Sequence, residues 1–124
     1  MRAVHSTLTP PELAIMKIVW RRGSVTVRDV YEALRAQRRV AYTTVMTMMN
    51  ILETKRYLKK DTQNRAYRYR PARPERAVIT AMVREFVKRV FDGTPRPLLL
   101  HLVQEERLSD NEREELLRLI KEAK

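Results

Sequence analysis

Apolar residues recur with helical spacing in residues 40–54, in the middle of the chain. Val45, Met48, Met49 and Leu52 stand at positions i, i+3, i+4 and i+7, so they form one stripe along a helix. A stripe of this width is typical of a helix that packs on a core. The pattern therefore predicts an amphipathic helix that ends shortly after this segment.

The opposite face of this predicted helix is polar but uncharged, although 33% of the chain's residues are charged. The face consists of Thr43, Thr47, Asn50 and Thr54, with Thr44 at its edge. Cations stand at the two ends of the helix instead, as Arg38, Arg39, Lys55 and Arg56. Hydroxyl and amide groups can bond base edges in a DNA major groove, threonine methyls can contact thymine, and flanking cations can hold phosphates. The alternative is an ordinary half-buried helix that another part of the protein covers.

Two shorter helices are predicted before this one. Thr9 and Glu12 form a capping-box pattern with proline between them, and Gly23 is placed to end the helix that follows. Thr26 and Asp29 repeat the pattern for a second helix. A short turn joins that helix to the threonine-faced one. Two helices in this order, the second with a face that fits a groove, predict a helix-turn-helix.

A β-hairpin is predicted directly after the helix-turn-helix. Residues 57–61 read as a strand, residues 62–65 supply turn chemistry, and residues 66–70 alternate tyrosine with arginine. Arg65 would lie at the tip and Arg68 on the cationic face. This arrangement predicts a wing that lies along a phosphate backbone. An edge strand that its charges protect from aggregation is the alternative.

The last third of the chain has a different character. Pro71 and Pro74 interrupt it, and residues 75–91, 98–103 and 109–120 then carry helical apolar patterns. About fifty residues are too few to bury so much apolar surface alone. We therefore expect two copies to pack together, and a two-fold dimer would place two recognition helices about 34 Å apart, or a multiple of that, on one DNA face. The alternative is that these helices fold back on their own winged domain.

The net charge of +11 is unevenly distributed. Residues 1–73 hold 16 Lys+Arg and 5 Asp+Glu, whereas residues 74–124 hold 10 of each class. The excess positive charge therefore belongs entirely to the segment with the predicted helix-turn-helix. A basic part joined to a neutral part indicates a polyanion-binding domain attached to a module with another role. No stretch combines a lysine-rich face with a wide apolar face, so nucleic acid is favoured over a membrane surface.

Several function classes find no support in the sequence. Cysteine is absent and only two glycines are present, which argues against disulfides, thiol chemistry and glycine-rich phosphate loops. His5 and His101 have no partner at the spacing of a metal site. No apolar run approaches the ~20 residues of a membrane span. We expect a cytoplasmic protein that is not an enzyme, uses no cofactor or metal and does not insert into a membrane.

Four stretches of the chain are found together in one protein family. They are Leu8–Thr9 with Glu12, Met16 and Trp20, then Ala41–Thr47, Tyr67–Tyr69 and Leu108–Leu116. Together they resemble the penicillinase-repressor family, the BlaI, MecI and CopY type. The resemblance implies a dimeric winged-helix repressor that binds operators of dyad symmetry upstream of genes such as those for β-lactamases, penicillin-binding proteins or copper transporters. It also implies a membrane-bound metalloprotease sensor as a partner, whose signal leads to cleavage of the repressor.

Matched by position, the resemblance makes Thr43, Thr44 and Thr47 recognition contacts and places the wing tip at Arg65. It puts the cleavage point at His101–Leu102, where repressors known to be cut have Asn-Phe.

Two further positions depart from the family pattern. Ile51 stands where arginine is frequent, which removes one phosphate contact. Arg56 stands where glycine is frequent, so a residue with a side chain has to end the helix, at some cost if its φ is positive. The cysteines of the copper-sensing branch are absent.

The predicted fold is mainly α with a small β wing: a winged helix-turn-helix domain in residues 1–73, then a helical dimerisation module in residues 74–124. The predicted function is sequence-specific repression of transcription by a homodimer, with release by proteolysis in the dimerisation module. The rivals are a sequence-indifferent architectural or RNA-binding protein and an adaptor whose threonine face packs on protein. The predicted DNA-binding residues are Arg39, Tyr42, Thr43, Thr44, Thr47, Asn50, Lys55, Arg65 and Arg68.

Overall fold

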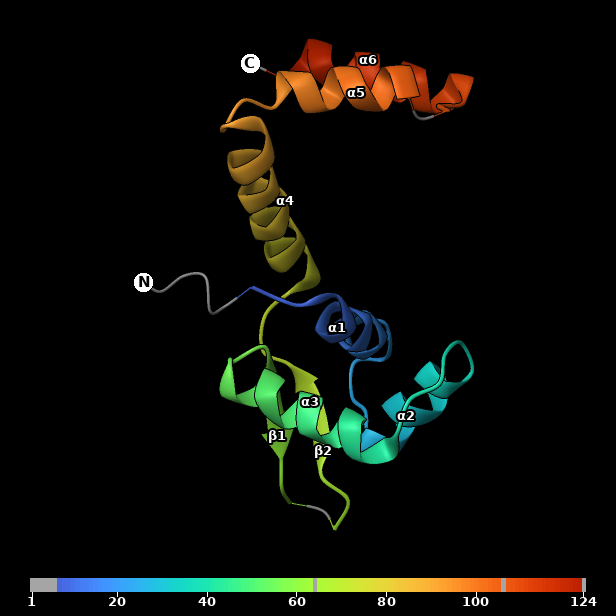
Figure 1. The fold of residues 1–124 in the computed structure, drawn as a ribbon, viewed down its shortest axis with the longest axis vertical. Coiled ribbons are helices and arrows are strands. Elements are labelled where there is room, and N and C mark those ends of the chain that lie inside the picture. The colour runs from blue at the N-terminus through green and yellow to red at the C-terminus, as the bar shows by residue number, and fades with distance from the viewer. Residues whose placement is uncertain (1–6, 64, 106, 124) are drawn as a thin grey trace. The chain divides into compact units, whose positions relative to one another are not determined.

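A computed structural model describes residues 7–63, 65–105 and 107–123. His5 lies outside these residues. The elements in chain order are α1 (Pro10–Arg22), α2 (Val27–Arg35), α3 (Tyr42–Thr54), β1 (Leu58–Asp61), β2 (Arg68–Pro71), α4 (Glu75–Phe91), α5 (Arg96–Glu105) and α6 (Asp110–Glu122) (Figure 1). The chain divides into two compact units, Met1–Met82 and Val83–Lys124, so the boundary falls inside α4.

The two capping boxes predicted for the first unit are both formed. The backbone N–H of Thr9 donates to Glu12 Oε1 at 2.9 Å, and the backbone N–H of Glu12 donates to Thr9 Oγ1 at 3.3 Å. Thr26 and Asp29 make the same reciprocal pair at the start of α2. Gly23 ends α1 with a φ of 87°, a conformation that glycine adopts without strain. The predicted starts of α1 and α2 and the predicted end of α1 are confirmed.

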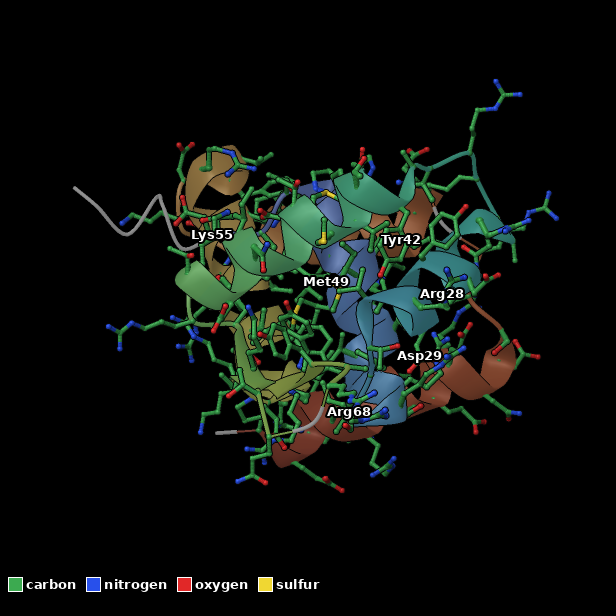
Figure 2. The ribbon with its side chains drawn as sticks, turned by 90° about the horizontal axis from the view of Figure 1, so that it is seen from below. Arg28, Asp29, Tyr42, Met49, Lys55 and Arg68 are labelled. Atoms are coloured by element: carbon green, nitrogen blue, oxygen red, sulfur yellow. The ribbon has the colours of Figure 1, made fainter. Side chains whose placement is uncertain are left out.

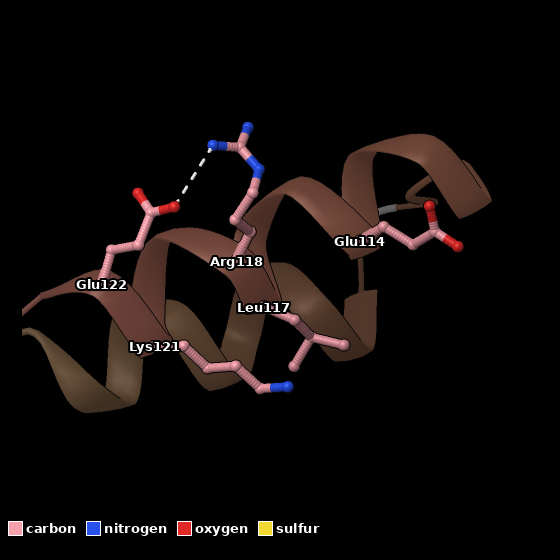
Figure 3. Close-up of a pocket in the computed structure, with 5 residues that line it drawn as sticks. All are labelled: Glu114, Leu117, Arg118, Lys121 and Glu122. Atoms are coloured by element: carbon pink, nitrogen blue, oxygen red, sulfur yellow. Dashed lines mark ion pairs between the residues drawn. The ribbon is translucent and has the colours of Figure 1, made fainter.

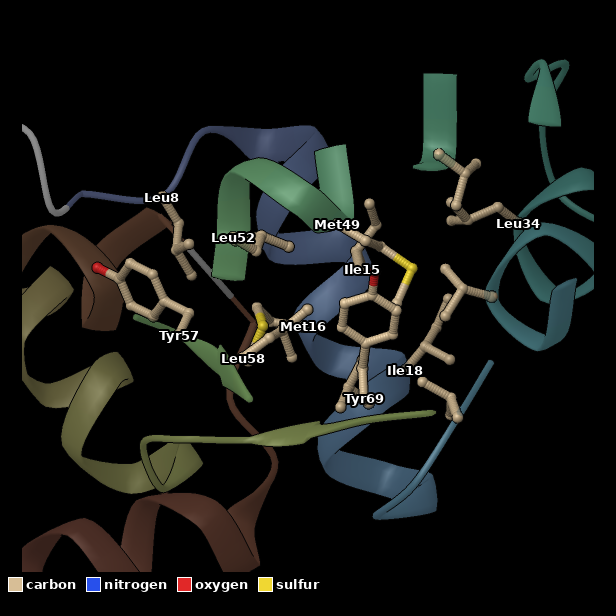
Figure 4. Close-up of a cluster of buried hydrophobic side chains, with 14 of the residues drawn as sticks. Leu8, Ile15, Met16, Ile18, Leu34, Met49, Leu52, Tyr57, Leu58 and Tyr69 are labelled. Atoms are coloured by element: carbon tan, nitrogen blue, oxygen red, sulfur yellow. The ribbon is translucent and has the colours of Figure 1, made fainter. Parts of the chain in front are cut away.

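The core of the first unit forms where α1, α2 and α3 meet the hairpin (Figure 4). Val45, Met49 and Leu52 of the predicted α3 stripe are fully buried, and Met48 is half-buried against them. Because one stripe of α3 is held in this core, the opposite stripe must face outward. The remaining buried apolar side chains are Leu8, Ile15, Met16, Ile18, Val19, Val25, Val30, Leu34, Tyr57, Leu58, Tyr69 and Val78.

The hairpin pairs β1 and β2 antiparallel, with Leu58 opposite Pro71 and Asp61 opposite Arg68. Its second strand begins two residues later than the alternating pattern indicated. Tyr69 is 2% exposed because it enters the core, where its backbone also bridges to Val25, whereas Tyr67 precedes the strand and is 50% exposed. The hairpin itself is confirmed, and its paired part is shorter than predicted.

Arg56 directly follows the C-cap of α3, Lys55, and has a φ of 70°. The backbone N–H of Tyr57 donates to the carbonyl of Leu52 at 2.9 Å, which closes the helix end. A left-handed residue with a side chain is strained relative to glycine. The sequence expectation for this position is therefore confirmed.

The segment after the wing contacts two aromatic residues of the first unit. Trp20 Nε1 donates to the carbonyl of Arg73 at 2.9 Å, and the Arg73 guanidinium lies 4.5 Å from the centre of the Tyr57 ring. Val78, one turn into α4, is buried in the same core. The first unit therefore includes the start of α4.

The second unit contains the end of α4 together with α5 and α6. The predicted capping box at Ser109 and Glu112 is present and starts α6. None of the residues that the structure describes between Val83 and Ala123 is buried. The exposed large apolar side chains of the second unit are Val83, Phe86, Val90, Leu99, Leu100, Leu102, Val103, Leu117, Leu119 and Ile120. Across the described ranges, no helix has the length and apolar character that crossing a bilayer requires.

Candidate nucleic-acid interface

The outward face of α3 is uncharged and open to solvent. Thr43, Thr44, Thr47 and Asn50 are all exposed, and α3 has no cationic residue between Tyr42 and Thr54. Tyr42 and Lys55 mark the two ends of this helix in Figure 2. These positions fit the predicted recognition face.

A groove of about 500 Å³ lies between α3, the start of α2 and the hairpin. Each of its walls carries a cation over an aromatic ring. Arg28 lies 5.7 Å from the centre of the Tyr42 ring, and Lys60 lies 5.0 Å from that of Tyr67. The groove is lined by Thr26, Val27, Arg28, Tyr42, Met46, Asn50, Lys60, Ala66, Tyr67 and Tyr69.

Arg28 and Lys60 were not among the predicted DNA-binding residues. Arg28 is the second residue after the N-cap Thr26, in the first turn of α2, where a cation is unfavourable for the helix dipole. This unfavourable position of a cation was the signal in the sequence that could have indicated a binding role for Arg28. Lys60 gave no comparable signal, because only the folded hairpin brings it beside α3.

Asn50 is oriented by the hairpin. The hydroxyl of Tyr69 donates to Asn50 Oδ1 at 3.2 Å. Because Tyr69 is buried and fixed in β2, its hydroxyl holds the carboxamide at the edge of α3 that borders the groove. The structure thus brings α3 and the predicted wing into contact.

Lys55 lies at the end of α3 and contacts α1. Its Nζ donates to Glu12 Oε1 at 2.9 Å and to Oε2 at 3.1 Å. Burial raises the pKa of the Glu12 carboxyl, but the N–H of Thr9 and the ammonium of Lys55 outweigh burial and lower this pKa below its ordinary value. Lys55 therefore has a structural partner, and its predicted phosphate contact stays a prediction.

Arg68 also has partners inside the domain. Its Nε donates to Ser24 Oγ at 2.9 Å, and its Nη2 donates to the Ser24 carbonyl at 3.0 Å. The N–H of Thr26 lowers the pKa of Asp29, burial opposes this, and the charge of Arg68 adds to the lowering. Arg68 thereby supports the start of α2, and its phosphate contact also stays a prediction.

The other two predicted cations are open to solvent. Arg39 is exposed in the turn between α2 and α3, and Arg65 is exposed near the tip of the hairpin. Their contacts with phosphates stay predictions.

The predicted cleavage point lies in the second unit. His101 and Leu102 are both exposed and fall within α5. A protease that binds its substrate as an extended strand can cut this bond only after α5 unwinds locally.

The second unit has a shallow hollow of about 380 Å³ on α6, lined by Glu114, Leu117, Arg118, Lys121 and Glu122 (Figure 3). Arg118 and Glu122 form an ion pair across one turn at 3.8 Å. Leu117, which is 56% exposed, is the apolar side chain of this otherwise charged lining.

Comparison with known proteins identifies the family. The penicillinase repressor family model matches residues 8–122. The transcriptional regulator BlaI of Mycobacterium tuberculosis is 34% identical over 113 residues, which cover 90% of this chain and 80% of the relative. The penicillinase repressor of Bacillus licheniformis is 26% identical over 117 residues (94% and 91%), and the methicillin resistance regulatory protein MecI of Staphylococcus aureus is 23% identical over 113 residues (91% and 92%).

A solved structure agrees with the fold. The solution structure of the DNA-binding domain of the repressor BlaI matches with a TM-score of 0.51 at 26% identity, and it covers 55% of this chain and 83% of that domain. The first unit is therefore a winged helix-turn-helix domain, with α2 and α3 as the helix pair and β1–β2 as the wing. The chain belongs to the penicillinase repressor family.

Proposed function

We propose that this protein represses transcription in the cytoplasm by binding a dyad-symmetric DNA operator as a homodimer. The observation that carries the proposal is the exposed, uncharged face of α3, which the core packing turns outward beside the wing. The names of the relatives support the regulatory role, and the solved BlaI domain supports DNA as the partner.

In this proposal α3 lies in the major groove. Thr43, Thr44, Thr47 and Asn50 contact base edges through their hydroxyl, methyl and amide groups, and Tyr42 packs at the start of the helix. The surrounding cations hold the phosphates on both sides of the groove and fix the register of the helix on the duplex. These cations are Arg28, Arg39, Lys60 and Arg65, together with Lys55 and Arg68. Like Lys55, Arg28 and Lys60 have carboxylate partners in the domain, Glu32 at 3.2 Å and Glu53 at 3.7 Å, and each would share its charge between that partner and a phosphate.

The second unit would join two copies. Its exposed valines, leucines, isoleucine and phenylalanine, among them Phe86, Leu119 and Ile120, form more apolar surface than a stable separate unit leaves in water. A second copy of the same chain would cover this surface, and its two-fold symmetry would match a dyad operator.

Release would follow proteolysis of the second unit at His101–Leu102, initiated by a membrane-bound metalloprotease sensor. Cutting α5 would divide the apolar surface of each copy, and the half-site affinity of a single winged domain is far below that of the dimer. The exposure of both residues supports access of a protease to this helix.

The proposal is tested by footprinting the purified chain on the DNA upstream of its own gene, with excess random duplex as competitor. We expect a protected site with dyad symmetry that survives the competitor. Equal binding to all duplexes would overturn sequence-specific repression and favour a sequence-indifferent architectural or RNA-binding protein, the alternative function that the basic charge alone supports.

A further inference from the structure

The side chains on the outward face of α3 end mostly in methyl groups. Met46 is 40% exposed and Ile51 is 41% exposed, although both are apolar. They flank the threonine row on its two sides: Met46 lines the groove next to the wing, and Ile51 lies about one helical turn from Thr47 and from Thr54 along the face.

One hydrogen-bond donor on this face, the Thr54 hydroxyl, is already paired. This hydroxyl donates to the carbonyl of Asn50 at 3.1 Å, inside the helix. The only donor of this side chain is therefore used inside the helix, which leaves the methyl group and the acceptor lone pairs of the oxygen for a partner.

The same face lacks the groups that read guanine most strongly. Guanine offers two acceptors to the major groove, and arginine or lysine reads them with paired donors. No such side chain stands between Tyr42 and Thr54. Thymine instead presents a methyl group, which apolar side chains and threonine methyls contact.

From this face we infer that the protein reads its operator mainly through thymine methyl groups, with Met46, Thr47 and Ile51 as specificity-determining residues. The inference rests on the proposed function and names the chemistry by which that site discriminates sequences. A methyl group withdrawn from water contributes a factor of about four in affinity. Several such contacts in each half-site multiply into a marked preference for one sequence.

The experiment begins with the full chain and a pool of random duplexes, from which the bound sequences are selected. Each thymine of the selected site is then replaced by deoxyuridine, which removes the methyl group and keeps base pairing. Each guanine is replaced by 7-deazaguanine, which removes the N7 acceptor. We expect deoxyuridine to weaken binding about fourfold at specific thymines in each half-site, and 7-deazaguanine to have a smaller effect at every guanine.

A matched pair of variants separates methyl contact from hydrogen bonding. Thr47→Val keeps the branched shape and removes the hydroxyl, whereas Thr47→Ser keeps the hydroxyl and removes the methyl group. We expect Thr47→Val to retain affinity and Thr47→Ser to lose about fourfold. Met46→Ala and Ile51→Ala should each abolish the effect of deoxyuridine at one thymine. All these residues are exposed, so thermal unfolding checks that each variant folds.

The outcomes are distinct for the inference and for the proposed function. A selected operator whose affinity does not respond to deoxyuridine, or that Thr47→Val binds weakly and Thr47→Ser binds tightly, overturns methyl reading and leaves the repressor intact. Dominant effects of 7-deazaguanine would assign recognition to cations outside α3 and overturn the inference in the same way. A pool from which no sequence is enriched overturns the proposed function and this inference together.

Discussion

Lys55 and Glu12 join the end of α3 to the beginning of α1. The ammonium lies 2.9 and 3.1 Å from the two carboxylate oxygens, and Glu12 is only 5% exposed. The same carboxylate accepts the capping hydrogen bond from the N–H of Thr9. A single buried group thus stabilises a helix start and also holds the recognition helix against its neighbour.

We expect Lys55→Met to lower the free energy of unfolding by about 2 kcal/mol, because it leaves the Glu12 carboxylate buried with one partner fewer. Urea unfolding of the full chain measures this change. Lys59→Met is the matched control, since Lys59 is exposed on β1 and its loss should change stability by less than about 0.5 kcal/mol. Equal losses in the two variants would contradict a specific role for the pair.

Acidification should lower the free energy of unfolding of the first unit, because two of its carboxyl groups become protonated. The pKa values of Glu12 and Asp29 are both lowered in the folded state from ordinary values of 4.5 and 3.8. A lowered folded pKa contributes stability above the unfolded value, and this contribution is lost as the pH falls through the folded pKa. We therefore expect the free energy of unfolding to decrease from about pH 5 downward.

Glu12→Gln and Asp29→Asn test the origin of this acid sensitivity. Each variant should be less stable than the parent at neutral pH and should lose less stability between about pH 5 and about pH 3. Denaturant titrations at several pH values provide the measurement. Parallel curves for the parent and both variants would show that other groups cause the acid response.

Replacing Arg56 by glycine should stabilise the protein. A side chain at a φ of 70° costs about 1 kcal/mol, and glycine removes this cost at the expense of some entropy in the unfolded chain. We expect Arg56→Gly to raise the free energy of unfolding by a few tenths to about 1 kcal/mol. Arg56→Ala removes the same charge but keeps the backbone cost, so a gain in the alanine variant would point to charge repulsion instead.

The two kinds of DNA contact should respond differently to substitution. Thr44→Ala should weaken operator binding more than binding to random duplex, because a base contact carries sequence information. Arg65→Ala should weaken both alike and make the dependence on salt shallower. With about six phosphates neutralised, log K should fall against log salt with a slope near −5 in the parent.

Lys17→Ala controls for the loss of one positive charge outside the proposed interface, since Lys17 is exposed on α1. Its salt slope should equal that of the parent. Equal slopes for the parent and for Arg65→Ala would remove the wing from the set of phosphate contacts.

Dimerisation should depend on the apolar surface of the second unit. Ile120→Glu places a charge on an exposed apolar position of α6 and should shift sedimentation equilibrium toward the monomer. Asn111→Glu adds the same charge in the polar first turn of α6 and should leave the equilibrium unchanged. A parent chain that sediments as a monomer at every concentration would refute the dimer directly.

Local sequence signals were sufficient to predict where three of the helices begin and which side of α3 is buried. Thr9, Thr26 and Ser109, each followed three residues later by an acidic residue, predicted where α1, α2 and α6 begin, because a capping box involves only neighbouring residues. The apolar stripe of α3 predicted which side of that helix is buried, and therefore which side is available to DNA.

Contacts between distant residues were beyond these signals. Lys55 and Arg68 were placed among the phosphate contacts because of their charge, but their partners Glu12 and Ser24 lie 43 and 44 residues earlier in the chain. The start of β2 was misplaced because the ladder between the two strands ends with the pair Asp61 and Arg68. Alternation along a strand indicates which face each side chain takes, but the length of the connection decides how far the pairing extends.

Trp20, whose indole N–H donates to the Arg73 carbonyl, is also a natural optical probe. Trp20 is the only tryptophan of the chain, and it belongs to the winged domain. Emission excited selectively at tryptophan therefore reports on the winged domain alone, whereas far-ultraviolet circular dichroism reports on all helices. Comparing the two signals during denaturation will separate the melting of the DNA-binding domain from that of the second unit, without any added label.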